Sequence, residues 1–179
     1  MSTTSLENTI SDVPEQLKPW LLTSESLTKR LRASLPDVSI NLLNANWDNT
    51  TWWDKYILNI QYERAYIRQV IISSATNQCW FARTVIPQAT YEKRASLFAN
   101  LSSKSLGDVL FHDKSFKRQQ LAFYPVTSSD IEYHWAMAYS SHSIAKQLWV
   151  RRSVFMVEGE ALYILEVFLP SFVKLLCKD

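Results

Sequence analysis

Residues 148–169 read LWVRRSVFMVEGEALYILEVFL, and this stretch decides the fold class. Two runs rich in β-branched and aromatic residues, 148–157 and 160–169, lie on either side of a Glu-Gly dipeptide, and such runs are typical of strands. Glycine tolerates the positive φ that a two-residue hairpin turn requires. We therefore predict an antiparallel β-hairpin, which indicates a sheet whose strands are joined by tight turns.

The rest of the chain adds strands and short helices around this hairpin. Residues 65–73 and 79–86 are predicted to form a second hairpin across a polar break. The remaining expected elements are strands at 38–47, 56–62 and 117–127, a loop at 48–54, a short helix after Pro14, a helix capped by Ser24 and ended by Pro36, short helices at 90–101 and 105–111, and an irregular or partly helical connection at 128–147. Together they predict an α+β domain on an antiparallel sheet.

Length and composition agree with one domain. The chain has 179 residues, of which 47% are hydrophobic and 13% aromatic, and this is enough to bury one sizeable core. We predict a loose leader over residues 1–13 and a single domain over residues 14–179.

The composition also excludes several kinds of site. The chain has only two glycines, Gly107 and Gly159, where average usage gives roughly a dozen. Loops that cradle the phosphates of a nucleotide need two or three glycines close together, so we expect no nucleotide cofactor. The histidines, His112, His134 and His142, and the two cysteines show none of the spacings of a metal site. We therefore expect no metal.

Charge and hydropathy argue against two kinds of partner. The 19 Lys and Arg against 17 Asp and Glu give a net charge of +2, which is too small to indicate a nucleic-acid-binding protein. The N-terminal sequence MSTTSLENTISDVPEQL has no basic region followed by an apolar run, so no export signal is visible. No apolar stretch reaches the roughly 20 residues that cross a bilayer. We expect a cytoplasmic protein that neither inserts into a membrane nor binds nucleic acid.

One acidic residue interrupts an apolar face of the last predicted strand. Strand side chains alternate between faces, so Glu166 shares a face with Ile164 and Phe168. A buried carboxylate must be paired or must hold a proton at a raised pKa, and a raised pKa suits acid or base chemistry near neutrality. A two-residue turn places Arg151 opposite Glu166, and a longer loop places Arg152 there. A structural ion pair and a catalytic or ligand-binding glutamate both remain open.

Two arginines lie inside the predicted hairpin of residues 65–86. Arg68 is surrounded by aromatic and β-branched neighbours, and Arg83 lies between Phe81 and Val85 on the paired strand. A guanidinium in such a strand needs a planar anion or a carboxylate as its partner. A substrate carboxylate and a cross-strand acid both meet this need, so both arginines are candidate ligand-binding residues.

Several blocks of sequence are distinctive when they are taken together and in order. They are PWLL (19–22) with SLTKR (26–30), IRQV (67–70), ARTVIP (82–87), LG (106–107) with LF (110–111), WVRRS (149–153) and LEVFLP (165–170). These blocks resemble those of the bacterial chorismate pyruvate-lyase family, and the resemblance covers about residues 17–170.

The resemblance implies a fold, an activity and a set of site residues. The implied fold is one α+β domain whose antiparallel sheet carries an internal ligand cavity closed by helical flaps. The implied activity splits chorismate into 4-hydroxybenzoate and pyruvate, the first committed step of ubiquinone synthesis, without a metal or organic cofactor. By resemblance, Arg68 binds the ring carboxylate, Glu166 approaches the 4-hydroxyl end, the backbone amides of Leu27 and Leu106 contact the ligand, and Arg83 lies near the cavity.

The chemistry of the implied substrate suits these residues. Chorismate is a dianion, so we expect Arg68 to hold one carboxylate and Arg83 the other, with Glu166 as the candidate for proton transfer. Whether Glu166 acts as base, acid or hydrogen-bond anchor stays open. An enclosed site releases product slowly, so we also expect inhibition by 4-hydroxybenzoate. We expect the protein to be a monomer.

Two other functions stay open at this point. Effector-binding domains of some bacterial transcription regulators are similar in fold, so a non-enzymatic sensor of a small ligand is the main alternative. In a third interpretation, Arg68 and Glu166 are ion-pairing residues in the core of an interaction domain. Turnover of chorismate distinguishes the enzyme from the sensor, and binding of 4-hydroxybenzoate distinguishes both from the interaction domain.

Overall fold

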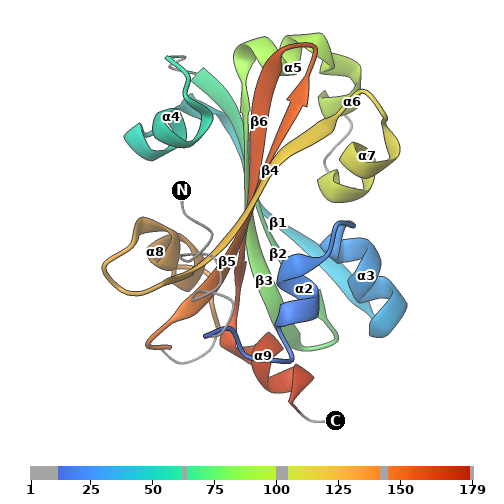
Figure 1. The fold of residues 1–179 in the computed structure, drawn as a ribbon, viewed down its shortest axis with the longest axis vertical. Helices are drawn as coiled ribbons and strands as arrows, with labels where there is room; N and C mark the ends of the chain where they lie inside the picture. Colours follow the sequence, from blue (N-terminus) through green and yellow to red (C-terminus); the bar gives the residue numbers. More distant parts are fainter. Residues whose placement is uncertain (1–11, 62–63, 100–104, 142–144, 178–179) are drawn as a thin grey trace.

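The described residues form a six-stranded antiparallel sheet with short helices around it (Figure 1). The structure is a computed structural model that describes residues 12–61, 64–99, 105–141 and 145–177. The strands are β1 (Val38–Asn49), β2 (Arg64–Ser74), β3 (Asn77–Pro87), β4 (Lys117–Val126), β5 (Leu148–Val157) and β6 (Glu160–Phe168). Their order in the sheet is β1-β2-β3-β6-β5-β4, so β3 and β6 join its two halves.

Short helices cover both faces of this sheet. They are α2 (Lys18–Leu22), α3 (Leu27–Ser34), α4 (Trp52–Leu58), α5 (Gln88–Lys93), α6 (Ala95–Ala99), α7 (Leu106–His112), α8 (Ile131–Met137) and α9 (Pro170–Leu176). In Figure 1, α2, α3, α6 and α7 lie on one side of the sheet, whereas α4 and α8 lie on the other. The α+β class predicted from the sequence is confirmed.

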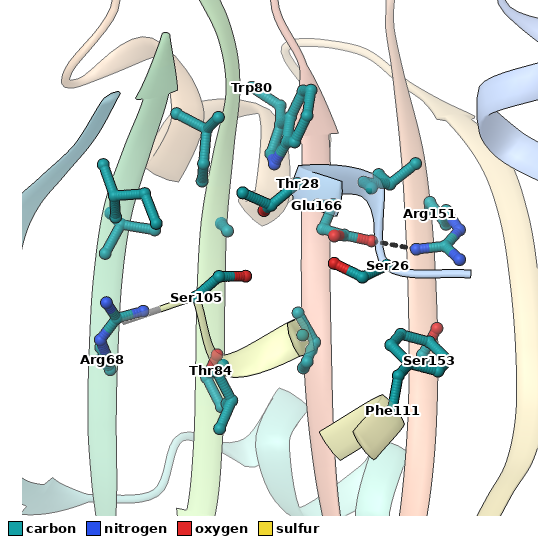
Figure 2. Close-up of a pocket in the computed structure, with 18 of the residues that line it drawn as sticks. Ser26, Thr28, Arg68, Trp80, Thr84, Ser105, Phe111, Arg151, Ser153 and Glu166 are labelled. Carbon is teal, nitrogen blue, oxygen red and sulfur yellow. Dashed lines mark hydrogen bonds and ion pairs between the residues drawn. The ribbon is translucent and has the colours of Figure 1, made fainter. Parts of the chain in front are cut away.

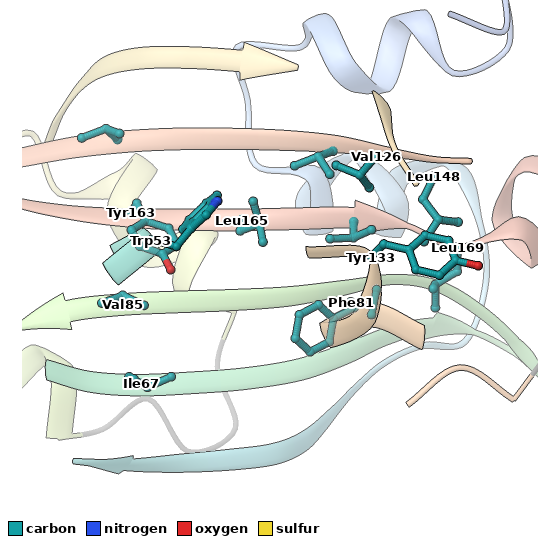
Figure 3. Close-up of a cluster of buried hydrophobic side chains, with 14 of the residues drawn as sticks. Trp53, Ile67, Phe81, Val85, Val126, Tyr133, Leu148, Tyr163, Leu165 and Leu169 are labelled. Atoms are coloured by element: carbon teal, nitrogen blue, oxygen red, sulfur yellow. The ribbon is translucent and has the colours of Figure 1, made fainter. Parts of the chain in front are cut away.

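The sheet separates hydrophobic clusters on its two faces. One cluster lies between the sheet and helices α4 and α8, and Figure 3 shows Trp53 and Tyr163 together at one end of it, with ring centroids 5.6 Å apart. On the opposite face, a second cluster packs with α2, α3 and α9, and a third packs with α6 and α7. The second and third clusters meet around the pocket described below.

Both predicted hairpins are present. β2 pairs with β3, and β5 pairs with β6 in a register that places Arg151 opposite Glu166. In the turn between β5 and β6, Glu158 and Gly159 have φ angles of 50° and 86°, as a two-residue turn with two positive φ values requires. The register of the shorter loop is therefore confirmed, and the longer-loop alternative is excluded.

The predicted loop at 48–54 and the predicted strand at 56–62 are wrong. β1 extends into the first of these segments, and α4 then covers Trp52–Leu58. Thr51 and Asp54 form a capping box, in which the Asp54 N–H donates to Thr51 Oγ1 at 3.2 Å and the Thr51 N–H donates to Asp54 Oδ2 at 2.8 Å. These bonds satisfy free N–H groups at the start of the helix and outweigh the β-propensity of its aromatic residues.

The other predicted helices are present with shifted ends. The helix predicted at 90–101 corresponds to α5 and α6, and its last two residues lie outside the described ranges. Ser26 rather than Ser24 caps α3, because Ser26 Oγ accepts the N–H of Lys29 at 3.3 Å. The connection predicted at 128–147 contains α8 and is therefore partly helical.

The last residue of the leader predicted over residues 1–13 is packed in the structure. Residues 1–11 lie outside the described ranges, so the leader is not tested there. Val13 is 4% exposed and packs in the cluster with α2. The boundary predicted between residues 13 and 14 therefore falls inside the packed region.

A buried ion pair fixes α4 to the sheet. Asp54 is fully buried and Arg83 is 3% exposed, and Arg83 Nη2 donates to Asp54 Oδ2 at 3.1 Å while Arg83 Nη1 contacts the other carboxylate oxygen. The Tyr163 hydroxyl donates to the same carboxylate, and the Arg83 guanidinium carbon lies 4.4 Å from the ring centroid of Trp135. Burial by itself raises the pKa of Asp54, but the charge and hydrogen bonds of Arg83, together with the hydrogen bonds from Tyr163 and Thr51, hold that pKa below its usual value.

Asp54→Ala should lower the free energy of unfolding by about 3–5 kcal/mol, because it leaves the buried Arg83 without its carboxylate partner. Urea unfolding at pH 7 measures this change, with Asp48→Ala at an exposed position of β1 as the control, expected within about 0.5 kcal/mol of wild type. The stability contributed by Asp54 is lost as the pH falls through its lowered pKa, so the difference should shrink in acid. A loss below about 1 kcal/mol at pH 7 would contradict the role of this pair.

Candidate active site

A pocket lies on the face of the sheet that α3 and α7 cover (Figure 2). Strands β2, β3, β5 and β6 supply most of its floor, and the first residues of α3 and α7 form its roof. The space that atoms leave unfilled, the mouth included, measures about 510 Å³. The polar and charged residues that line it are Ser26, Thr28, Arg68, Thr84, Ser105, Arg151, Ser153 and Glu166.

Two rows of paired residues cross the strands and form the floor. The first row is Arg68, Thr84, Ile164 and Ser153, and the second is Val70, Ala82, Glu166 and Arg151. The two rows are two residues apart along each strand, so all of these side chains emerge on the same face. All of them line the pocket.

Arg68 and Glu166 face the pocket from strands that β3 separates. Two strand spacings of about 4.8 Å and an offset of two residues place their Cα atoms roughly 12 Å apart. Figure 2 shows Thr84 on the strand between them, and Ala82, directly opposite Glu166, adds only a methyl group to the floor there. This spacing suits a small planar ring with a polar group at each end.

Glu166 is ion-paired and lines the pocket at the same time. Arg151 Nη1 donates to Glu166 Oε2 at 2.6 Å, and the two residues are only 2% and 9% exposed. Burial raises the pKa of Glu166, and the opposing effect of Arg151 does not bring it back to its usual value. The ion pair that was one alternative is therefore present, and it leaves the glutamate facing the pocket.

Arg151 also holds the segment that leads into α3. Its Nη2 donates to the backbone carbonyl of Thr23 at 2.9 Å and to that of Glu25 at 3.3 Å. One guanidinium therefore connects the carboxylate on the floor with the chain segment that begins the roof.

A second set of contacts joins the two roof helices. Ser26 Oγ donates to Asp108 Oδ1 at 2.8 Å, and Arg32 Nη1 donates to Asp108 Oδ2 at 2.8 Å. Gly107 suits this close approach, because a Cβ at that position would lie 3.1 Å from Ser26 Oγ. The carboxylate of α7 thus ties α3 to α7 above the pocket.

Arg68 supplies a buried cation at the end of the pocket away from Glu166. It is 3% exposed, and burial lowers the pKa of its guanidinium while Tyr66 acts in the opposite direction. An arginine remains charged throughout the physiological range, so this end of the pocket favours a carboxylate.

Leu27 and Leu106 both line the pocket from the first position of a helix. Leu27 begins α3 and Leu106 begins α7, and the two are 1% and 3% exposed. The first N–H groups of a helix have no acceptor within that helix. These positions are compatible with ligand contacts through backbone amides, which stay a prediction.

Arg83 does not face the pocket. Ala82 and Thr84 line it, and because side chains alternate along β3, Arg83 projects to the opposite face and pairs with Asp54. The expectation that Arg83 holds a substrate carboxylate is therefore corrected. Its partner was missed because α4, which carries Asp54, was read as a loop followed by a strand.

Thr84 and Ser153 are pocket residues that were not singled out from the sequence. Thr84 could not be placed because the β2–β3 register shifts between Ile72 and Ser73, so counting from the turn does not give the facing pairs. Ser153 could have been found, since the β5–β6 register is regular and Ser153 lies two residues after Arg151 on the same face.

The described ranges contain neither a cluster of metal ligands nor a helix that could span a membrane. No group of three or more His, Cys, Asp or Glu side chains in them could hold a metal ion. No helix in the same part of the chain is both long and apolar enough to cross a bilayer. Cys79 is buried, Cys177 is exposed, and both are free thiols.

Comparison with known sequences finds one family, both in a family model and in individual relatives. A family model described as chorismate lyase matches residues 3–175. A protein of Aromatoleum aromaticum named "Probable chorismate pyruvate-lyase" is 33% identical over 165 residues, which cover 91% of this chain and 89% of that protein. Proteins with the same name from Pseudoalteromonas atlantica and Coxiella burnetii are 33% and 31% identical, covering 87% and 86% of this chain and 80% and 83% of their own lengths.

Comparison with solved structures identifies the same fold in other proteins. PhnF from Mycobacterium smegmatis matches with a TM-score of 0.62 at 10% identity, covering 83% of this chain and 65% of that chain. The effector domain of the same protein matches with a TM-score of 0.60 at 9% identity, covering 83% and 91%. At these identities the likeness shows a shared fold and nothing further.

Ala82→Val should lower the affinity for an aromatic carboxylate such as 4-hydroxybenzoate by about tenfold or more, because it adds two methyl groups to the floor between Arg68 and Glu166. Isothermal titration calorimetry measures the affinity, and Ala33→Val on the exposed face of α3 is the matched control. Unchanged affinity in Ala82→Val would show that the ligand does not lie on this part of the sheet.

Proposed function

This chain belongs to the chorismate lyase family and is a lyase, and from this premise we propose that it splits chorismate into 4-hydroxybenzoate and pyruvate. The observation that carries the proposal is the placement of Arg68 and Glu166 at opposite ends of one buried pocket, about 12 Å apart at their Cα atoms by strand geometry. That span fits one six-membered ring with a carboxylate at one end and a hydroxyl group at the other.

The proposed binding mode follows from the chemistry of the two ends. The ring carboxylate lies at Arg68, where a guanidinium donates two parallel hydrogen bonds and the first amides of α3 and α7 approach from the roof. The ring lies over Ala82 and Thr84, and its C4 hydroxyl end points toward Glu166. Binding in this orientation excludes water and fixes the reacting atoms relative to the carboxylate.

The reaction balances without oxidant or reductant. Glu166 removes the proton from C4, the electrons of that C–H bond complete the aromatic ring, and the C3–O bond breaks with its electrons moving to the enolpyruvate oxygen. A proton then reaches the methylene carbon of enolpyruvate and gives pyruvate. Arg151 supports the base by stabilising the ionised carboxylate, while burial keeps the pKa of Glu166 raised.

The proposal extends to what happens after the reaction. A product held beneath α3 and α7 leaves only when the roof opens, so we propose that 4-hydroxybenzoate inhibits the enzyme. We also propose that the reaction supplies the ring of ubiquinone, as the family resemblance implies. The cytoplasmic location and the monomeric state remain predictions.

Arg68→Ala should lower kcat/KM for chorismate by about 100-fold or more, because it removes the cation that the ring carboxylate requires. Purified protein is mixed with chorismate, and pyruvate and 4-hydroxybenzoate are quantified. Arg64→Ala, which removes an exposed arginine from the same strand, should leave kcat/KM unchanged. Absence of product with the wild-type chain would refute the proposed reaction, and linear progress curves in added 4-hydroxybenzoate would refute the enclosed product site.

Glu166→Gln should lower kcat by about 10²- to 10⁴-fold, because the amide cannot accept the C4 proton. In the wild-type chain, kcat/KM should fall as the pH falls through the raised pKa of Glu166, since protonation removes the base. The variant should lose this acidic limb, whereas Glu160→Gln on the same strand should keep it. A wild-type rate that instead falls as the pH rises through that range would assign Glu166 as an acid.

The non-enzymatic sensor that the sequence left open is not favoured, because the family model and the relatives indicate a lyase and the likeness to the effector domain of PhnF shows the fold alone. Both functions require a small ligand in the pocket, so binding alone does not separate them. A wild-type chain that binds 4-hydroxybenzoate but releases no pyruvate from chorismate would favour the sensor.

A further inference from the structure

The position of Arg83 leaves one end of the substrate without an assigned partner. Chorismate carries a second carboxylate on the enolpyruvyl arm, which is attached at C3 beside the C4 hydroxyl. In the proposed binding mode, Arg68 holds the ring carboxylate and Arg83 lies on the far side of the sheet. The second carboxylate must therefore be bound beside Glu166 by other groups.

The two sides of Glu166 along the strands differ in chemistry. On one side, the next row of paired residues is Ile72, Trp80 and Phe168, which carries no charge. On the other side lies the row that begins at Arg68 and ends at Ser153 on β5. Ser153 lies on the same face of β5 as the charged Arg151, two residues further along the strand. An anionic arm is favoured on the side of Ser153, because a carboxylate leaves water only for hydrogen-bond donors and positive charge.

Ser153 has a buried hydroxyl that faces this part of the pocket. The residue is 2% exposed and lines the pocket, and Figure 2 shows it close to Phe111. Its Oγ has no hydrogen-bond partner among the described residues. A buried hydroxyl without a partner costs free energy, and a ligand oxygen at this position would remove that cost.

Arg118 on β4 adds positive charge at the same corner. Its guanidinium carbon lies 5.4 Å from the ring centroid of Phe111, and its Nη2 donates to the carbonyl of Ser24 at 3.1 Å. Its Nη1 is buried, with no partner within the described ranges. The charges of Arg151 and Glu166 both act on Arg118, so this corner holds two cations against one carboxylate.

We propose that Ser153 and Arg118 form the subsite for the enolpyruvyl carboxylate of chorismate. This inference rests on the proposed function and specifies how the same pocket binds the second anionic group. Ser153 Oγ donates a hydrogen bond to the carboxylate. Arg118 supplies the positive charge, because Arg151 is already neutralised by Glu166. The product 4-hydroxybenzoate lacks this arm, so the subsite distinguishes substrate from product.

Two stable aromatic ligands test the subsite without catalysis. One is 3-(carboxymethoxy)-4-hydroxybenzoate, which carries a carboxylate on an ether arm beside the hydroxyl, and the other is 3-methoxy-4-hydroxybenzoate, which has the ether without the carboxylate. Calorimetry should show that Ser153→Ala weakens binding of the first ligand by about tenfold and changes binding of the second less than about twofold. Arg118→Gln should show the same selectivity. Ser74→Ala, which removes a buried strand hydroxyl outside the pocket, should affect neither ligand.

The outcomes separate this inference from the proposed function. Equal weakening of both ligands in Ser153→Ala and Arg118→Gln, or no weakening of either, would overturn the subsite. A wild-type chain that binds the carboxymethoxy ligand no better than the methoxy ligand would overturn it as well. If wild type releases no pyruvate from chorismate but these variants lose only the carboxymethoxy ligand, the subsite stands and the proposed reaction fails.

Discussion

The pairing of β3 with β6 is the constraint on which the candidate site depends. It joins the halves of the sheet and places Ala82 opposite Glu166 and Thr84 opposite Ile164. Arg68 belongs to one half and Glu166 to the other, so neither hairpin contains both ends of the pocket. A shift of one residue in this pairing would turn one of the two side chains away from the pocket. The position of a charged group in this site is therefore a property of strand register more than of local sequence.

Alternation along β3 gives adjacent residues opposite environments. Ala82 and Thr84 form part of a polar pocket, while Arg83 between them belongs to a closed ion pair with Asp54 beneath aromatic rings. Arg68 and Arg83 are both buried in the β2–β3 hairpin, yet Arg83 is neutralised by a protein carboxylate and Arg68 lines the pocket. The same sheet thus separates an ion pair that stabilises the fold from a cation that lines the pocket.

Prediction from the sequence was most accurate where local turn geometry is sufficient to set the pairing of two strands. The two-residue turn fixes the β5–β6 register, and this placed Arg151 opposite Glu166 correctly. Prediction from the sequence failed at α4. The aromatic-rich segment has the composition of a strand, but the capping hydrogen bonds between Thr51 and Asp54 stabilise a helix. That error hid the partner of Arg83. The joint placement of Arg68 and Glu166 came from family resemblance, because no periodicity reveals which strand lies between two hairpins.

Arg151 has a mechanical consequence as well as an electrostatic one. Its guanidinium is shared among the Glu166 carboxylate and the carbonyls of Thr23 and Glu25, which precede the roof helix. The segment cannot move away from the sheet without giving up hydrogen bonds to the guanidinium that also pairs with Glu166. In the proposed mechanism, an outward movement of this segment to exchange ligand would therefore also weaken the contact that stabilises the ionised Glu166 carboxylate.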